Sequence, residues 1–312
     1  MRYIKNNDTF VSAPALGNQD PIRGLEKRRA INSMLETFFN GAKNRNGLCL
    51  TGRNEMTDLL YEIKDRVAFL TINREDRRNA ISQEMILSFL ERLADVDQDE
   101  DIRAVCLTGT GEKAFCSGAD LGVTFTKDEG GRLPETGNYA RLLKEMAKFG
   151  KPLVARINGP CLAGGMGLML SCDIVLARND TYFCTPEVNV GIFPMMVGAL
   201  LYRNLPRKKA VDMVLTGRKI PATEAESMGM ITRAVEPGQL NNEVENTLKI
   251  LTSKSPIGTR MGKEAFRFMS DMPFEKAVDF LCEALGRAIS TQDAAEGMAA
   301  FLQKRAPKFT GK

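Results

Sequence analysis

Four glycines within nine positions lie directly before an apolar stretch in the segment GPCLAGGMGLMLSCD, residues 159–173. They are Gly159, Gly164, Gly165 and Gly167. Glycine weakens a helix by about 1 kcal/mol relative to alanine, so this position needs a sharp turn or the close approach of another group. The first N–H groups of a helix have no partner within it, and the helix dipole makes that end positive. Such donors suit a carbonyl oxygen that gains negative charge, as in an oxyanion hole.

Two other interpretations of these glycines remain open. Phosphate-binding loops also lie between a strand and a helix, but the spacing matches neither GxGxxG nor GxxxxGK[ST], and no Lys-Ser or Lys-Thr pair follows. Close packing of a helix against a strand is the second alternative, because it also requires glycine. The sequence therefore favours an oxyanion hole or close packing over nucleotide binding.

The chain contains no histidine among its 312 residues. This excludes Ser-His-Asp and Cys-His catalysis and histidine metal sites, and it leaves acid–base chemistry to carboxylates, Lys, Tyr or Cys. The seven cysteines form no CxxC pair, which indicates reduced thiols in a cytosol-like compartment. We therefore expect a cytoplasmic protein with no metal site.

Strand-like and helix-like segments alternate from Met56 to about residue 205. Apolar residues at helical spacing predict helices at residues 82–96 and 139–149, with Ser82 as the N-cap of the first. Short apolar runs predict strands at residues 59–63, 67–72, 104–109, 152–157 and 173–177. This alternation indicates an α/β core with mainly parallel strands.

Beyond residue 205 the pattern is mostly helical. Helices are predicted at residues 207–217, 242–253, 257–270, 274–289 and 294–304. They indicate a second layer or an assembly surface. We expect three regions: an N-terminal extension over 1–55, a core over 56–250 and a helical region over 251–312.

Positive charge is concentrated at the N-terminus. Residues 1–53 hold nine basic and four acidic side chains, whereas the remainder holds 34 basic and 35 acidic ones. No basic stripe runs through the body of the chain, so a nucleic-acid partner is not expected. No apolar run approaches the roughly 20 residues that span a bilayer. The N-terminal extension is a docking arm, an unstructured leader or a targeting helix, and the last would imply an organelle.

Seven stretches resemble the crotonase (enoyl-CoA hydratase/isomerase) superfamily over residues 66–305. In chain order they read RRNAIS, KAFCSGADL, KPLVARINGPCLAGG, CDIVLA, TPEVNVGIFP, RKKAVDMVLTGRKIPATEA and EGMAAFLQKR. The resemblance implies an α/β spiral of ββα units, a C-terminal helical region that forms a homotrimer or a dimer of trimers, and acyl-CoA thioester substrates. No cofactor is implied beyond the coenzyme A of the substrate.

The resemblance also assigns roles to individual residues. The two oxyanion-hole N–H groups would come from Ser117 and Gly164, and Glu187 would be the catalytic carboxylate. The remaining assigned residues would contact coenzyme A, and they are Arg78, Asn79, Ala80, Gly118, Ala119, Asp120, Phe301 and Lys304. A neighbouring subunit would often contribute the last two. Alternatively, Phe301 is a core residue and Lys304 a solvated one.

The chain departs from the family pattern at Gly167. Hydratases of this family carry a glutamate there and a second one at the position of Glu187. One carboxylate is enough to move a proton between C2 and C4 of an acyl chain, which is isomerase chemistry, whereas hydration must also hold a water molecule. Replacing Gly167 with glutamate is expected to restore the second carboxylate. Met195 and Met196 replace a glycine-rich run and indicate a reshaped acyl pocket.

Other groups near the expected site leave alternatives open. Asp128 or Glu129, on a polar loop, would supply the missing carboxylate if that loop closed over the acyl pocket; a solvated loop is the alternative. Three cysteines, Cys116, Cys161 and Cys184, have no identifiable partner base and are interpreted as small buried residues.

Three functions are consistent with these features. The first is an enzyme of the enoyl-CoA hydratase/isomerase type that uses an oxyanion hole and one carboxylate. The second is a decarboxylase or thioester hydrolase of the same fold. The third is an acyl-CoA-binding protein without catalysis, for which Gly167 is the main support.

Residues 1–55 are expected to be dispensable for catalysis, because both the resemblance and the neutral charge balance begin after them. We expect a shortened chain of residues 56–312 to fold and to retain full turnover of its substrate. Circular dichroism and an activity assay of the shortened and full chains would test this. Loss of folding or activity on shortening would contradict it.

Overall fold

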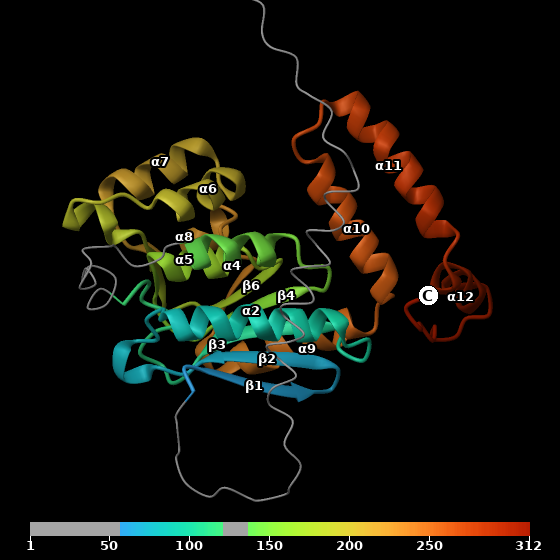
Figure 1. Ribbon diagram of the computed structural model, residues 1–312, viewed down its shortest axis with the longest axis horizontal. Coiled ribbons are helices and arrows are strands. Elements are labelled where there is room, and N and C mark those ends of the chain that lie inside the picture. Colours follow the sequence, from blue (N-terminus) through green and yellow to red (C-terminus); the bar gives the residue numbers. More distant parts are fainter. Residues whose placement is uncertain (1–56, 121–136) are drawn as a thin grey trace, which may run out of the picture. The chain divides into compact units, whose positions relative to one another are not determined.

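A computed structural model describes residues 57–120 and 137–312 (Figure 1). These residues belong to one compact unit, Glu55–Lys312. The N-terminal extension, and the loop that carries Asp128 and Glu129, lie outside the described residues.

A six-stranded sheet forms the centre of the unit, in the order β1-β2-β3-β4-β6-β9. The β1–β2 pair is antiparallel, and every other neighbouring pair is parallel. Its strands are β1 (Leu59–Lys64), β2 (Val67–Ile72), β3 (Ala104–Gly109), β4 (Leu153–Ile157), β6 (Ile174–Arg178) and β9 (Arg233–Val235). A smaller sheet has the order β5-β7-β8 and consists of β5 (Cys161–Leu162), β7 (Tyr182–Cys184) and β8 (Ile220–Pro221). The five predicted strands are all present.

Helices follow or connect these strands. They are α2 (Gln83–Gln98), α4 (Gly137–Ala147), α5 (Gly164–Leu170), α6 (Met195–Asn204), α7 (Arg207–Thr216), α8 (Ala222–Ser227), α9 (Leu240–Thr252), α10 (Pro256–Met269), α11 (Phe274–Ile289) and α12 (Gln292–Leu302). Three short 3-10 helices are η2 (Glu75–Arg77), η3 (Pro186–Val190) and η4 (Pro237–Gln239). The α/β core and the helical C-terminal region predicted from the sequence are confirmed.

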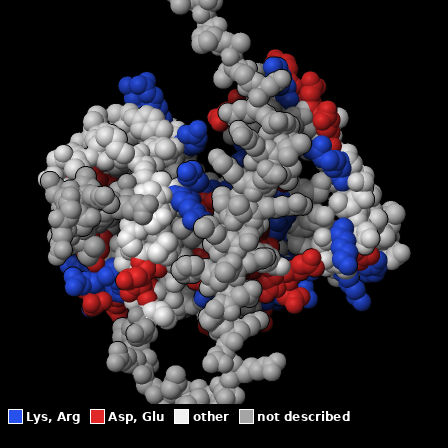
Figure 2. Space-filling view, in the orientation of Figure 1, with Lys and Arg blue, Asp and Glu red and all other residues white. Residues whose placement is uncertain are grey.

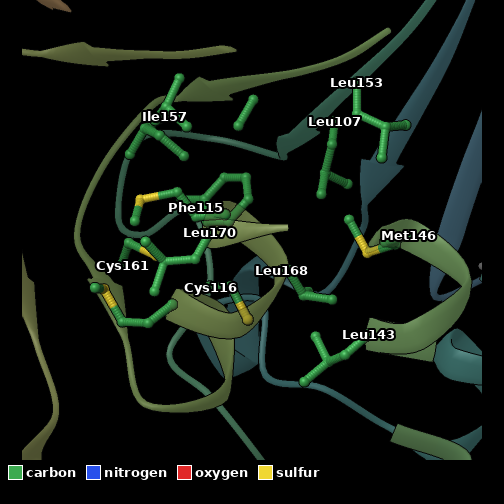
Figure 3. Packing of buried hydrophobic residues seen from close by; sticks show 14 of the residues in the cluster. Leu107, Phe115, Cys116, Leu143, Met146, Leu153, Ile157, Cys161, Leu168 and Leu170 are labelled. Atoms are coloured by element: carbon green, nitrogen blue, oxygen red, sulfur yellow. The ribbon is translucent and has the colours of Figure 1, made fainter. Parts of the chain in front are cut away.

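The central sheet is apolar on both faces. On β3, Val105 and Leu107 face the cluster that contains α2, α4 and α5, whereas Ala104 and Cys106 face α9. Successive side chains of a strand point to opposite faces, so a strand covered on both sides reads as a continuous apolar run. Figure 3 shows Leu107 and Leu153 of the larger cluster together with Leu168 of α5.

Helix α2 illustrates how local sequence sets an element. Ser82 is its N-cap, and its side-chain oxygen accepts a hydrogen bond from Met85 N at 3.0 Å, as predicted. Met85, Phe89 and Leu93 are buried against the sheet at helical spacing. This packing fixes residues 80–84, which border the candidate site.

The C-terminal helices α10, α11 and α12 pack mainly on one another. Phe268 and Phe280 meet edge to face with ring centres 6.5 Å apart, and Arg260 pairs with Asp97 of α2 at 2.8 Å. Many large apolar side chains of this region remain exposed on the single chain: Phe266, Phe268, Met272, Phe274, Val278, Leu285, Ile289, Met298, Phe301 and Leu302.

Basic and acidic side chains are intermixed on the described surface shown in Figure 2. Over the described parts of the chain, no helix is both long and apolar enough to cross a membrane.

Candidate active site

A cavity of about 660 Å³ lies between the segments that the sequence singled out. Its lining includes Ile81, Ser117, Ala119, Asp120, Tyr139, Ala163, Gly164, Glu187, Val190, Ile192, Phe193, Met195 and Met196. The structure therefore brings together the glycine segment, the GAD segment (118–120) and the TPEVNVGIFP segment (185–194). Its walls are mostly apolar, with a few polar groups, as in sites for small organic ligands.

Gly164 opens α5 and lines this cavity. The residue before it, Ala163, has φ +46°, a conformation that costs a residue with a side chain about 1–3 kcal/mol. The strained turn is held because Ala163 N donates to Cys184 O at 2.9 Å. No acceptor for Gly164 N occurs within the described chain, so this donor is available to a ligand.

Ser117 does not supply the second donor that the resemblance assigned to it. Its N–H already donates to the Arg78 carbonyl oxygen at 3.1 Å. Two residues further on, Ala119 forms a bridge with Ile81, in which Ile81 N donates to Gly118 O and Asp120 N to Ile81 O. Ala119 N lies between these bonds on the opposite side of the segment, and the described residues offer it no acceptor. The prediction for Ser117 is wrong, and Ala119 is the donor that the cavity can use.

The Ala119 and Gly164 donors are close together. A Cβ atom added to Gly164 would lie 3.7 Å from Ala119 N, and one added to Gly118 would lie 3.0 Å from Gly164 N. Gly118 has φ +93°, a conformation that favours glycine. Gly165 has a different function, because a Cβ there would lie 2.6 Å from Cys116 O. The close-packing interpretation is therefore confirmed at Gly165, and the oxyanion-hole interpretation of Gly164 stays a prediction.

Glu187 lies on η3 and forms another part of the cavity wall. It is half-buried, and among the described residues its Oε2 atom has no hydrogen-bond partner. Burial raises the pKa of Glu187 above its ordinary value. A carboxylate with a raised pKa is a stronger base, so Glu187 is suited to accept a proton inside the cavity.

Among the described residues, two other carboxylates line the same cavity. Unlike Glu187, one of them is ion-paired and the other is exposed. Asp120 is paired with Arg74, Oδ2 to Nη2, at 3.1 Å. Arg74 also contacts Asp58 at 3.1 Å and donates to Ala80 O at 2.7 Å, so Asp120 belongs to a structural network. Glu84 is exposed in the first turn of α2.

The space beside Gly167 is filled by Tyr139 of α4. A Cβ atom at position 167 would lie 2.2 Å from Tyr139 Oη and 3.3 Å from its Cζ. The Tyr139 hydroxyl donates to the Gly164 carbonyl oxygen at 2.5 Å. A glutamate at position 167 therefore requires the phenol of Tyr139 to move, because that phenol already occupies the space. No motif in the sequence singles out Tyr139.

Comparisons with known proteins show the family of the chain. The family described as Enoyl-CoA hydratase/isomerase matches residues 62–312. The chain belongs to this family. It is 31% identical over 254 residues to a short-chain-enoyl-CoA hydratase of Clostridium acetobutylicum, covering 80% of this chain and 97% of the relative. It is 33% identical over 251 residues to an (E)-benzylidenesuccinyl-CoA hydratase of Thauera aromatica, covering 80% and 98%.

The solved structure of an enoyl-CoA hydratase from Mycobacterium smegmatis has the same fold. Its TM-score is 0.76 at 31% identity, and the match covers 81% of this chain and 98% of that one. The crotonase-like fold is therefore confirmed, and the chain is an acyl-CoA-processing enzyme of the enoyl-CoA hydratase/isomerase type.

Three of the residues assigned to coenzyme A in this family, Arg78, Asn79 and Ala80, do not line the cavity. Asn79 is fully buried, and its side chain donates to Thr110 O at 3.0 Å and to Ala114 O at 2.7 Å. Its Oδ1 accepts from Arg74 N. These bonds hold the loop together, and the assignment of Arg78, Asn79 and Ala80 to coenzyme A stays a prediction. Arg78 is exposed, with φ +53°.

Phe301 and Lys304 lie at the end of α12 and also do not line the cavity. Phe301 is 83% exposed, so the alternative that it is a core residue is wrong. Their assignment to coenzyme A bound by a neighbouring subunit stays a prediction.

The cysteines near the site are buried, as predicted. Burial raises the pKa of the Cys116 thiol to about 12 and that of Cys161 well above its ordinary value. Figure 3 shows both side chains among apolar neighbours such as Phe115 and Leu170. A thiol in such surroundings stays protonated and is a poor nucleophile.

Proposed function

We propose that this enzyme transfers a proton at the α-carbon of an enoyl-CoA thioester, with Glu187 as its acid and base. The observation that carries the proposal is the presence, in one cavity, of a half-buried carboxylate with a raised pKa and two N–H groups to which the described residues offer no acceptor. Proton transfer next to a thioester needs both, because removal or addition of the α-proton passes through an enolate-like state.

In this proposal the thioester oxygen accepts hydrogen bonds from Ala119 N and Gly164 N. These fixed dipoles become more favourable as charge develops on the oxygen, so they stabilise the transition state more than the ground state. Glu187 then removes a proton from the substrate or delivers one to C2. No cofactor is required beyond the coenzyme A that the substrate carries.

The cavity walls favour an apolar acyl group. Val190, Ile192, Phe193, Met195 and Met196 form one side, and methionine side chains adapt to ligands of different shape. The enoyl-CoA and (E)-benzylidenesuccinyl-CoA named for the two relatives both fit a proton transfer beside a thioester.

The proposal is tested by incubating the purified protein with a 2-enoyl-CoA and a 3-enoyl-CoA and identifying the products by mass spectrometry. We expect addition of water to the first, migration of the double bond in the second, or both. Release of free coenzyme A or of carbon dioxide from a suitable acyl-CoA would instead support the hydrolase or decarboxylase. Binding without any product would support a non-catalytic protein.

A homotrimer or dimer of trimers is proposed for the assembly. The exposed apolar side chains of α10–α12, including Phe274 at 77% and Leu302 at 80%, form more apolar surface than an isolated chain normally exposes. Light scattering is expected to give three or six times the mass of one chain. A stable monomer at micromolar concentration would contradict this.

A further inference from the structure

We infer that Tyr139 takes the place of the carboxylate missing at position 167 and, together with Glu187, holds the water molecule that adds to the substrate. The inference rests on the proposed function of Glu187. With Tyr139 in this position, the enzyme is a hydratase that uses one carboxylate and one phenol. From the sequence, a single carboxylate had indicated isomerisation.

The position of the Tyr139 hydroxyl is the first observation. Its oxygen lies 2.2 Å from where a Cβ of residue 167 would be, so it stands at the base of the side chain that other hydratases carry there. Tyr139 lines the same cavity as Glu187, Ala119 and Gly164. The hydroxyl therefore lies beside the oxyanion-hole donor and within the space of the reaction.

The hydrogen bond that Tyr139 makes determines what its oxygen can do. Its only hydroxyl proton is donated to the Gly164 carbonyl oxygen at 2.5 Å. A phenol whose proton is used in this way has lone pairs left to accept, as a carboxylate does. Tyr139 Oη thus supplies a hydrogen-bond acceptor beside position 167, where this chain has no carboxylate.

Tyr139 stays uncharged, so it holds water without competing as the base. Burial raises its pKa well above the ordinary value, and negative charge on Glu187 is among the neighbours that add to the shift. Both side chains line the same cavity. Glu187 Oε2 has no described partner, so the pair offers one acceptor for each of the two hydrogens of a water molecule.

The reaction balances with these groups. Glu187 takes one proton from the held water molecule. At the same time the oxygen of that water bonds to C3 of the 2-enoyl thioester. The electron pair of the C2–C3 double bond moves toward the thioester oxygen, which Ala119 N and Gly164 N stabilise. Glu187 then returns the proton to C2, so that the elements of water are added and the carboxylate is regenerated. Tyr139 keeps its proton throughout.

Tyr139→Phe tests the inference, because it removes only the oxygen. We expect the ratio of 2-enoyl-CoA hydration to 3-enoyl-CoA isomerisation to fall at least about 10-fold, which is the size of effect of losing one buried hydrogen bond. Tyr61→Phe is the matched control, since Tyr61 is a partly buried tyrosine of β1 outside the cavity. It should leave the ratio unchanged.

A second variant tests whether a carboxylate at position 167 can replace the Tyr139 hydroxyl. In the Tyr139→Phe background the 2.2 Å contact at position 167 is gone, and the nearest ring atom, Cζ, lies at 3.3 Å. Adding Gly167→Glu there should restore hydration. Gly167→Glu alone should lower it, because Tyr139 still occupies the space.

Three results would overturn the inference. The first is a wild-type enzyme that isomerises 3-enoyl-CoA but adds no water to 2-enoyl-CoA, a result that depends on no variant. The second is an unchanged ratio in Tyr139→Phe. The third is an equal fall of the hydration and isomerisation rates in Tyr139→Phe. Tyr139 would then only hold the Gly164 carbonyl group in position. In each case the proposed function of Glu187 stands if Glu187→Gln abolishes the remaining reaction, and it fails if that reaction persists.

Discussion

Glu187→Gln is expected to lower kcat by at least about 100-fold while acyl-CoA affinity changes little. Glutamine keeps the size of the side chain and much of its hydrogen bonding, but its amide cannot accept a proton from water or substrate. The affinity should persist because the cavity walls and the two N–H donors are unaltered. Stopped-assay kinetics for kcat and isothermal titration for the dissociation constant would separate the two effects.

The pH profile gives a second readout of the same residue. Glu187 acts first as a base, so it must be ionised in the free enzyme. Because burial raises its pKa, the ionised fraction falls already at a pH above the range of an ordinary glutamate. The value of kcat/KM should therefore rise with pH through that raised pKa and level off above it. The acid limb should disappear in the residual activity of Glu187→Gln.

Glu84→Gln is the matched control, since Glu84 is another carboxylate at the cavity but is exposed in the first turn of α2. It should retain turnover and the acid limb of the profile. Wild-type turnover by a folded Glu187→Gln enzyme would contradict the mechanism. The base would then have to be sought on the loop of Asp128 and Glu129, which lies outside the described residues.

Local pattern was enough to predict the elements of the core. The strands of the central sheet and helix α2 are set by apolar periodicity and by the Ser82 cap, which act between residues close in sequence. Glu187 was assigned because the TPEVNVGIFP stretch resembles the enoyl-CoA hydratase/isomerase family, and burial in the structure raises its pKa.

Tyr139 was not predictable in this way. It lies 28 positions before Gly167 in the printed chain, on a different helix, and nothing in the sequence around either residue indicates the contact. The packing of α4 against α2 and α5 brings the hydroxyl to the glycine. A missing side chain is visible in a sequence, but the group that fills its place is visible only in three dimensions.

The assignment of the second N–H donor to Ser117 instead of Ala119 has a related cause. Both residues lie in one extended segment, and motif position alone does not reveal which N–H groups are already bonded. The partner residues Arg78 and Ile81 decide this, because they take up the N–H groups of Ser117 and Asp120. Among the described residues the N–H of Ala119 has no acceptor, and Ala119 lines the cavity. Sequence reasoning found the segment and missed the donor by two residues.

Gly164→Ala is expected to lower kcat/KM by about 100- to 1000-fold without lowering the melting temperature. A methyl group at this position would stand 3.7 Å from Ala119 N and directly beside Gly164 N, where the thioester oxygen must lie. Alanine keeps the backbone N–H, but its methyl group would block the oxygen from reaching that donor, and loss of one oxyanion-hole contact typically has an effect of this size. Stability should not fall, because Gly164 has no positive φ and alanine favours a helix by about 1 kcal/mol over glycine.

Gly198→Ala in α6 is the matched control for this substitution. It is also a helical glycine without positive φ, and a Cβ there would meet no atom within 4 Å. It should gain the same helix stability and keep full turnover. The new methyl group at position 164 would meet Ile81 Cδ1 at 3.1 Å, the movable end of a side chain, so the backbone has no reason to shift. A folded Gly164→Ala enzyme with wild-type kcat/KM would mean that the thioester oxygen is held elsewhere than between Ala119 and Gly164.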